Sequence, residues 1–237
     1  DVDGTLVPDG SSKINPEVFD TILKLREKGI QFAIASGRPW ASVEHAFEPV
    51  KRKIFYVANN GAYVGCCGRS LYVYSIEQEL VHRIIKKVRR YPDLEVVYAG
   101  ANGDYLESSN ERLMNWLIES YKFNLTRVDD LLGLDEPCVK VSIYKSQGIE
   151  AASRDIYEEF KDELKMSCAG DMWMDCMAKG VNKGRAIRTI QESLHIKPEE
   201  TMAFGDQLND MEMLEQAYYS FAVANARDEV RKAARFQ

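Results

Sequence analysis

The sequence predicts an α/β protein with a Rossmann-like core, in which a doubly wound parallel sheet carries an inserted α/β domain. Two observations lead to this fold class. Short apolar runs alternate with helical patterns at both ends of the chain, which is typical of parallel strands joined by helices. Between these ends the expected strands alternate apolar and polar residues, which favours a second sheet with one solvated face.

The bulk composition restricts the class of function. The 237 residues are 45% apolar and 29% charged, as in globular proteins. The net charge of −6 argues against general nucleic-acid binding, because no basic excess is available to neutralise phosphates. No stretch approaches the roughly 20 apolar residues of a membrane span. The five cysteines are odd in number and form no CxxC pair, which favours reduced thiols in the cytoplasm over disulfides or a zinc site.

Residues 1–76 are expected to form the first part of the core. Asn15 and Pro16 are typical of a helix start, and Gly29 is typical of a helix end. The expected elements that follow are a strand at residues 30–35, a helix to residue 47 and a strand at residues 54–58.

Residues 77–171 are expected to form the insert, and residues 172–237 the second part of the core. In the insert, helices are expected at residues 77–90, 111–121 and 149–164, and strands at residues 94–99, 104–107 and 138–144. In the second core part, strands are expected at residues 172–177, 201–204 and 220–223, and helices at residues 184–194, 208–217 and from 228 onward.

The opening motif carries the first chemical signal. Asp1 and Asp3 stand at i and i+2, so at a strand end both carboxylates point to the same side. Such carboxylates repel each other unless a cation lies between them or one is protonated. This indicates a divalent metal site, or a nucleophile beside an acid/base, with Gly4 allowing a sharp turn. A plain turn and a calcium loop are alternatives, although the further acids of a calcium loop are absent.

Further polar residues follow other core strands or begin core helices. Ser36 follows the strand at residues 30–35, and Lys183 precedes a helix. Asp206 and Asp210 are one helical turn apart. The carboxyl ends of parallel strands meet at one edge of an open sheet, where such sheets bind their ligands. Acids, a hydroxyl and a lysine at this edge are the groups that phosphoryl transfer requires.

The sequence resembles the haloacid-dehalogenase-like hydrolases over essentially its whole length, and in particular the Cof-type phosphatase branch with its large α/β cap domain. In that branch the cap is inserted between the second and third motifs, which is where residues 77–171 fall. The matching motifs, in chain order, are Asp1-Val2-Asp3-Gly4-Thr5, Ser36-Gly37-Arg38, Gly180-Val181-Asn182-Lys183-Gly184 and Gly205-Asp206-Gln207-Leu208-Asn209-Asp210.

The resemblance implies a Mg²⁺-dependent phosphatase that hydrolyses a small phosphomonoester, such as a sugar phosphate, through an aspartyl-phosphate. Asp1 would be the nucleophile and Asp3 the general acid/base, with Ser36 and Lys183 acting on the phosphoryl group. The implied metal ligands are Asp1, Asp3 (through its main-chain carbonyl), Asp206 and Asp210. The implied phosphate-binding residues are Gly4, Ser36, Gly37, Arg38, Asn60, Asn182, Lys183 and Asn209.

The sequence departs from the family pattern in three places. Gln207 stands where glycine is common, and Asp175 stands where the branch has a glutamate. The family's core also has an apolar strand just before the nucleophile, whereas nothing precedes Asp1 here. We therefore expect a missing strand between those at residues 30–35 and 201–204, and a missing final strand and helix after Gln237.

Two other functions remain open on the same core. A phosphomutase or phosphotransferase would use the same aspartyl-phosphate but return it to a sugar. A non-catalytic domain would only bind a phosphorylated ligand. For any of these, the expected partner is a small-molecule phosphomonoester rather than nucleic acid or a membrane, and the expected state is a monomer or weak homodimer. The insert is expected to act as a lid that selects the leaving group.

Overall fold

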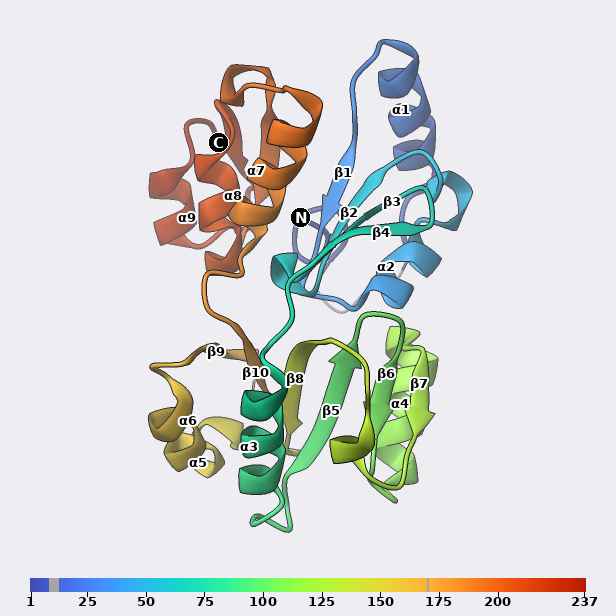
Figure 1. Cartoon of the computed structure of the whole chain (residues 1–237). Coiled ribbons are helices and arrows are strands. Elements are labelled where there is room, and N and C mark those ends of the chain that lie inside the picture. The colour runs from blue at the N-terminus through green and yellow to red at the C-terminus, as the bar shows by residue number, and fades with distance from the viewer. Residues whose placement is uncertain (9–12, 170) are drawn as a thin grey trace. The chain divides into compact units, whose positions relative to one another are not determined.

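The computed structural model describes residues 1–8, 13–169 and 171–237, and it divides into two compact units (Figure 1). The first unit, the core, comprises Asp1–Tyr72 and Val181–Gln237. The second unit, the insert, is the continuous segment Val73–Gly180. None of the helices that the structure describes has the length and apolar character needed to cross a membrane.

The strands of the core form two sheets. Parallel pairing joins β1 to β2 and β11 to β12, as the alternation of strands and helices predicts, whereas β2 pairs with β3 in antiparallel fashion. In the described residues β1 and β11 do not pair with each other, so the strand expected between them stays a prediction. The sheets contain, in order, β1 (Ala33–Ala35), β2 (Phe55–Ala58), β3 (Tyr63–Cys66) and β4 (Arg69–Val73), and β11 (Met202–Gly205) and β12 (Tyr219–Ala222).

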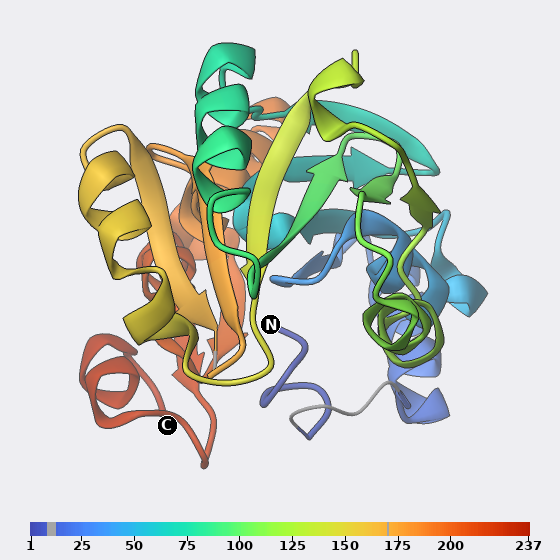
Figure 2. The same cartoon turned by 90° about the horizontal axis from the view of Figure 1, so that it is seen from below.

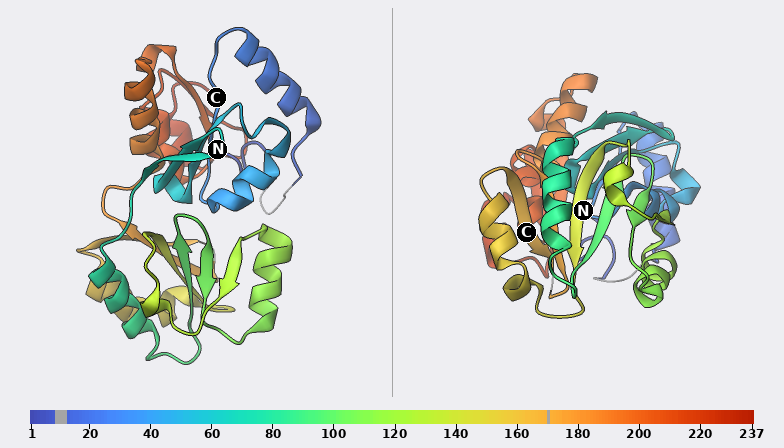
Figure 3. Two further views of the ribbon diagram at one scale, coloured as in Figure 1. Left: turned by 45° about the vertical axis from the view of Figure 1, so that its right-hand side comes forward. Right: turned by 60° about the horizontal axis from the view of Figure 1, so that its bottom comes forward.

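Helices cover both faces of the core strands, as a doubly wound fold requires. Ile34 and Tyr56 face the cluster that contains α1 and α2, whereas Ala35 and Val57 face the cluster that contains α7 and α8. Figures 1 and 3 show the blue helices on one side of the strands and the orange and red helices on the other. The core helices are α1 (Pro16–Glu27), α2 (Trp40–Ala46), α7 (Lys183–Leu194), α8 (Met211–Glu215) and α9 (Asp228–Ala233).

The insert has one mixed sheet with the strand order β7-β6-β5-β8-β10-β9. All its pairs are antiparallel except β6 with β7. Its strands are β5 (Glu95–Gly100), β6 (Asp104–Leu106), β7 (Leu125–Arg127), β8 (Cys138–Tyr144), β9 (Leu164–Ala169) and β10 (Trp173–Ala178). Its helices are α3 (Gln78–Val88), α4 (Glu111–Tyr121), α5 (Ile149–Ala152) and α6 (Arg154–Phe160).

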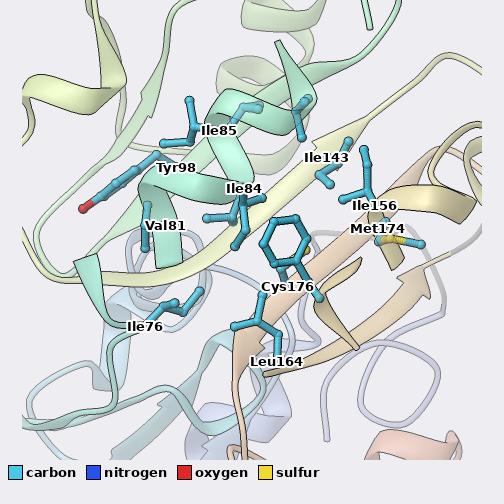
Figure 4. Close-up of a cluster of buried hydrophobic side chains, with 14 of the residues drawn as sticks. Ile76, Val81, Ile84, Ile85, Tyr98, Ile143, Ile156, Leu164, Met174 and Cys176 are labelled. Atoms are coloured by element: carbon cyan, nitrogen blue, oxygen red, sulfur yellow. The ribbon is translucent and has the colours of Figure 1, made fainter. Parts of the chain in front are cut away.

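Apolar side chains pack on both faces of the insert sheet. On one face, Val81 and Ile84 of α3 join Tyr98 of β5 and Ile143 of β8 in a buried cluster (Figure 4). Helices α3 and α6 lie side by side over this face (Figure 2). On the opposite face Val97 and Leu106 pack against α4. Side chains of one strand point alternately to the two faces, so both helical layers are needed to bury β5.

The α4 face of the insert sheet also carries a buried polar group, which we call the insert cluster: Asp104, Lys140, Ser142 and Asp175. Lys140 Nζ lies 3.1 Å from one oxygen of Asp175, and the Ser142 hydroxyl donates to the other at 2.6 Å. Asp104 and Lys140 flank Ala99 on its two neighbouring strands. Burial raises the pKa of Asp104 to about 7, although Lys140 acts in the opposite direction.

The structure corrects several expectations about the insert. The predicted boundary between residues 171 and 172 is wrong, because β10 pairs with β8 and β9 and so belongs to the insert. Residues 149–164 do not form one helix but α5 and α6, and Leu164 begins β9. Strand β8 is not half exposed: all but its last residue are buried, because its polar side chains belong to the insert cluster.

The core also differs locally from its prediction. The apolar run at residues 30–35 forms a strand only at Ala33–Ala35. The hairpin of β3 and β4 was not predicted. Its turn contains Cys67 and Gly68, both with positive φ, in place of the Asn-Gly pair that usually signals such a turn.

Candidate active site

Residues Asp1 to Val7 form a tight loop at the end of β11. The main-chain nitrogen of Asp1 donates to the carbonyl oxygen of Phe204 at 3.0 Å, and the Gly4 amide donates to the carbonyl of Val7 at 2.8 Å. Gly4 has φ +82°, and a Cβ added there would lie 2.2 Å from Asp206 Oδ2. Only glycine combines this backbone conformation with such a close approach to a carboxylate.

Lys183 is the centre of the site. Its Nζ lies 2.6 Å from Asp1 Oδ1 and 2.7 Å from Asp210 Oδ1, and its side chain is only 1% exposed. It begins α7, directly after Asn182, whose side-chain oxygen accepts from the Arg185 amide at 2.7 Å. Asn182 is therefore the N-cap of the helix that positions the lysine.

Asp210 is fully buried and ionised. Burial is the largest single effect and by itself would raise its pKa, but the charges of Lys183 and of the N-terminal ammonium, with hydrogen bonds from Lys183 and the Gln207 amide, together outweigh it. The pKa of Asp210 is therefore below its ordinary value. Its second oxygen accepts from the amides of Asp206 (3.0 Å) and Gln207 (3.1 Å), so this carboxylate holds the loop that carries Asp206.

The carboxylates of Asp1, Asp206 and Asp210 each place one oxygen within 4.8 Å of the others. Oxygen ligands of this type suit Mg²⁺. Asp206 also accepts from the Thr5 hydroxyl at 2.7 Å and from the Gln207 side chain at 3.2 Å, so its orientation is fixed. Two of the three acids, Asp1 and Asp206, fit a metal ligand role directly, whereas Asp210 is already engaged by Lys183 and two amides.

Asp3 does not join this group of acids; its carboxylate is held by Arg38 instead. Arg38 Nε donates to Asp3 Oδ2 at 2.9 Å, and Arg38 Nη2 contacts Asp3 Oδ1. The Arg38 amide donates to the hydroxyl of Ser36 at 3.1 Å, and Ser36 is fully buried directly after β1. The structure thus brings the first two motifs together through an arginine–carboxylate pair with two contacts.

The predicted phosphate-binding asparagines also meet at this site. Asn209 Nδ2 donates to Asn60 Oδ1 at 2.9 Å. A Cβ on Gly37 would lie 3.2 Å from the same Asn60 oxygen, so Gly37 lies against it. Gly61 has φ +99°, and a Cβ there would lie 2.3 Å from the carbonyl oxygen of Asn182. The turn at Asn60 and the start of α7 therefore pack closely against each other.

Three residues of the site lay outside the predicted set. The first is Thr5, whose hydroxyl holds Asp206 and which belongs to the opening motif. The second is Asn59, which is buried with φ +47° and, among the described atoms, has an Oδ1 without a hydrogen-bond partner. The third is Asn225, which donates to the Gly4 carbonyl at 2.8 Å. The Asn-Asn-Gly sequence signals the turn at Asn59, but nothing in the sequence singles out Asn225.

Comparison with known proteins agrees with this geometry. The family model of haloacid dehalogenase-like hydrolases matches residues 1–237. The 5-amino-6-(5-phospho-D-ribitylamino)uracil phosphatase YbjI of Escherichia coli is 26% identical over 100% of this chain and 88% of its own length. The phosphatase YitU of Bacillus subtilis, which is named for the same substrate, is 26% identical over 99% of this chain and 88% of its own length.

A crystal structure from Eubacterium rectale is similar over the whole fold. It is 33% identical, covers 99% of this chain and 90% of its own chain, and has a TM-score of 0.91. The predicted α/β fold class is confirmed by this likeness and by the parallel pairs of the core. The prediction of a phosphatase that acts on a phosphomonoester is confirmed by the family match and the curated relatives. The chain therefore belongs to the haloacid dehalogenase-like hydrolases.

Proposed function

We propose that this chain hydrolyses a small phosphomonoester with the help of Mg²⁺, through an aspartyl-phosphate on Asp1. The observation that carries the proposal is the 2.6 Å contact between Lys183 Nζ and Asp1 Oδ1. The buried lysine holds one oxygen of the carboxylate, and the second oxygen has no hydrogen bond within the described part of the chain. A carboxylate held in this way can attack with its second oxygen.

In the first step, an oxygen of Asp1 attacks the phosphorus atom, and the bond from phosphorus to the ester oxygen breaks. Asp3 gives a proton to the leaving oxygen, which departs as an alcohol. In the second step, Asp3 takes a proton from water, and the water oxygen attacks the phosphorus of the aspartyl-phosphate. The bond to Asp1 breaks, which releases inorganic phosphate and restores the carboxylate. Lys183 stabilises negative charge on Asp1 and on the phosphoryl oxygens.

The metal would be held by the carboxylates of Asp1 and Asp206 and by the main-chain carbonyl of Asp3. The 4.8 Å grouping of the acids supports this assignment. When bound, Mg²⁺ supplies positive charge that neutralises the nucleophile and the phosphoryl oxygens. Asp210 acts one step further away, because its oxygens hold Lys183 and the Asp206 loop.

Arg38 is assigned to Asp3 rather than to the phosphate. Its two contacts with Asp3 fix the orientation of that carboxylate, which must point at the leaving oxygen in both steps. The predicted phosphate contacts of Ser36, Asn60, Asn182 and Asn209 remain part of the proposal. Ser36 and the Asn60–Asn209 pair are supported by their place beside Arg38 and the start of α7.

The substrate is proposed to be a phosphorylated metabolite with a small polar leaving group. Both curated relatives described above are named for a phosphorylated ribitylamino-uracil, so that ester is the first candidate. Sugar phosphates, pyridoxal phosphate and nucleoside monophosphates are the other classes. The insert is proposed to select among them, since the motifs of the core act on the phosphoryl group alone. A cytoplasmic location, inferred from the cysteine pattern, belongs to the same proposal.

The test is phosphate release from a panel of these esters by the full chain, with and without Mg²⁺. Asp1→Asn should lower kcat by about 10³-fold or more, because an amide of the same size is a poor nucleophile. Asp20→Asn, which changes an exposed carboxylate of α1, is the matched control and should leave kcat unchanged. Wild-type rates in Asp1→Asn would overturn the assignment of the nucleophile.

The metal assignment has a separate test. Asp206→Asn should raise the Mg²⁺ concentration for half-maximal activity by at least about 10-fold, because one of few protein ligands is weakened. An unchanged magnesium titration would remove Asp206 from the ligand set. Transfer of the phosphoryl group to an added sugar phosphate, with no free phosphate formed, would show that the chain is a mutase or transferase and not a hydrolase.

A further inference from the structure

Two adjacent cysteines occupy the turn between β3 and β4. This turn belongs to the core, and neither cysteine is one of the active-site residues described above. Cys66 ends β3, and Cys67 has φ +57° and is followed by Gly68 with φ +74°. A side chain other than Asn or Gly is unfavourable at the first of these positions. The two Sγ atoms nevertheless lie 3.3 Å apart, and Cys67 is exposed.

A disulfide is a poor product for this pair. Neighbouring Cα atoms are about 3.8 Å apart across a trans peptide, which is below the roughly 4.4 Å minimum of ordinary disulfides. A direct sulfur–sulfur bond would therefore be strained and easily reduced. Burial, together with the neighbouring Cys67 thiol, also raises the pKa of Cys66 to about 11, so little of it is thiolate at neutral pH. That slows reaction with peroxides.

The spacing suits two bonds to a single larger atom. With bonds of about 2.3 Å, sulfurs 3.3 Å apart subtend roughly 90° at the atom between them. Two-coordinate Cu(I) prefers a linear arrangement, and a structural zinc site needs four ligands. Among the described residues, the group of three or more potential metal ligands is Asp1, Asp206 and Asp210, so no third side chain of this kind joins the two thiols. Trivalent arsenic is pyramidal, with bond angles near a right angle.

An apolar groove of about 500 Å³ lies beside the two thiols. Phe55, Leu71, Tyr72 and Leu194 line it together with Cys66 and Cys67. Leu71, Tyr72 and Leu194 are among the large apolar side chains that are most exposed to water, at 47%, 41% and 39%. The Tyr72 hydroxyl and the Ser193 hydroxyl lie 3.1 Å apart and join the two walls of the groove. An aromatic or alkyl group bound at the thiols would cover this surface.

We propose that Cys66 and Cys67 form a binding site for trivalent organoarsenicals, whose organic group lies in the neighbouring groove. With an arsenoxide, the arsenic–oxygen bonds break and two arsenic–sulfur bonds form. The two thiol protons leave with the oxygen as one water molecule. Arsenic stays trivalent throughout, so neither an oxidant nor a reductant is needed.

The experiment uses the full chain and phenylarsine oxide, with mass spectrometry of the intact protein and a count of reactive thiols. One phenylarsenic group should add per chain, and both thiols of the pair should be protected. Cys66→Ser should weaken binding by about 100-fold or more, because the second arsenic–sulfur bond is no longer intramolecular. Cys168→Ser, which removes an exposed cysteine outside the pair, should bind like the wild type.

A second variant separates loss of binding from loss of folding. Cys67→Asn should keep or improve stability, because Asn tolerates the left-handed φ at this turn, and it should still lose binding. Leu194→Ser should weaken phenylarsine oxide several-fold more than inorganic arsenite, which lacks an organic group. Wild-type affinity in either cysteine variant, or no uptake by the wild type, would overturn the site. Equal effects of Leu194→Ser on both compounds would overturn the role of the groove.

Discussion

Two lysine side chains are buried in the described residues, and acids surround both, yet the two surroundings are built differently. Lys183 contacts Asp1 and Asp210, whose chain positions are far apart. Lys140 contacts Asp175, its partner across the strands of one sheet. The first lysine lies at strand and helix ends, where main-chain amides are available, whereas the second lies in the middle of a sheet, where they are used in pairing.

The acids beside the two lysines respond in opposite directions. The pKa of Asp210 falls below its ordinary value, despite burial, because Lys183 and main-chain amides act on it. The pKa of Asp104 in the insert cluster rises to about 7, because burial dominates and Glu136 adds like charge. Asp210 thus stays ionised because Lys183, the N-terminal ammonium and main-chain amides together outweigh burial, whereas at Asp104 the charge of Lys140 and one backbone hydrogen bond do not overcome it. The first arrangement suits chemistry that needs permanent charges.

The largest expected difference between the surroundings of Lys183 and those of Lys140 is the loss of kcat when each lysine is replaced. Lys183→Met leaves three acids without a cation and should abolish measurable turnover, with a loss of about 3–5 kcal/mol in stability. Lys140→Met should cost stability in the same range but leave phosphate chemistry at saturating substrate much less affected. Parallel measurements of kcat and of denaturant unfolding compare the two variants. Similar losses of kcat in both would show that the insert cluster also serves catalysis.

The next largest effect concerns Asp104. Its replacement is expected to increase stability, whereas replacement of either lysine decreases it. Its folded pKa of about 7 lies above its unfolded value of 3.8, so the folded state binds the extra proton. Its contribution to stability is therefore greatest below pH 3.8, and it declines as the pH rises towards 7. By pH 8 the ionised carboxylate costs about 4 kcal/mol relative to a neutral group. Asp104→Asn should therefore stabilise the protein at pH 8 and change little at pH 3.

Denaturant unfolding of wild type and Asp104→Asn between pH 3 and pH 9 measures this difference. The gain should grow from about pH 4 and level off above about pH 7. Asp129→Asn, at an exposed position of the insert, is the control and should show no such gain. A variant that is less stable than the wild type at pH 8 would mean that Lys140 compensates the charge of Asp104 fully.

A smaller difference in kcat is expected when two arginines with the same contact geometry are replaced in turn. Arg38 contacts both oxygens of Asp3, and Arg89 in the insert contacts both oxygens of Glu107. Arg38→Met should lower kcat by about 10²-fold with little change in KM, because Asp3 loses its orientation. Arg89→Met should leave both constants unchanged. A raised KM with normal kcat in Arg38→Met would assign this arginine to the phosphate instead.

The smallest effect compares two helix caps. Asn182 caps α7 in the core, and Asn110 caps α4 in the insert. Alanine at either position should cost about 1 kcal/mol of stability. Asn182→Ala should also lower activity, since α7 carries Lys183, whereas Asn110→Ala should not. Thermal unfolding and kcat/KM on the same samples check both statements. Normal activity in Asn182→Ala would show that the helix cap does not contribute to catalysis.

The residues around Lys183 and those around Lys140 also differ in how far they could be predicted from the sequence. Lys183 begins α7, Asp206 follows β11 and Asp210 precedes α8, so the expected ends of strands and helices predicted that these residues lie at one edge of the sheet. Asp1 was placed there by its motif. The contacts of Lys140 depend on strand register, which no local pattern specifies. The polar side chains of β8 were consequently expected to face water.

Other errors have local causes. The hairpin of β3 and β4 was missed because Cys67 takes the place of the usual Asn in its turn. Strand β9 was missed because it follows α6 after a short turn and continues its apolar pattern at Leu164. The role of Arg38 could not be predicted either, since its motif suggests phosphate binding and only the structure shows Asp3 within its reach.

The insert is one continuous segment, whereas the core is assembled from two pieces of chain. During synthesis, the insert Val73–Gly180 is made before the core segment Val181–Gln237. The contact of Lys183 with Asp1 closes a loop of 182 residues, which costs about 4–5 kcal/mol of chain entropy when that loop is unfolded. A folded insert shortens the flexible part of this loop to the flanking core segments, which lowers the cost by about 0.8 kcal/mol. The contacts of the insert lie within one continuous segment, whereas the contact of Lys183 with Asp1 joins distant parts of the chain, so we expect insert structure to return before enzymatic activity during refolding from denaturant.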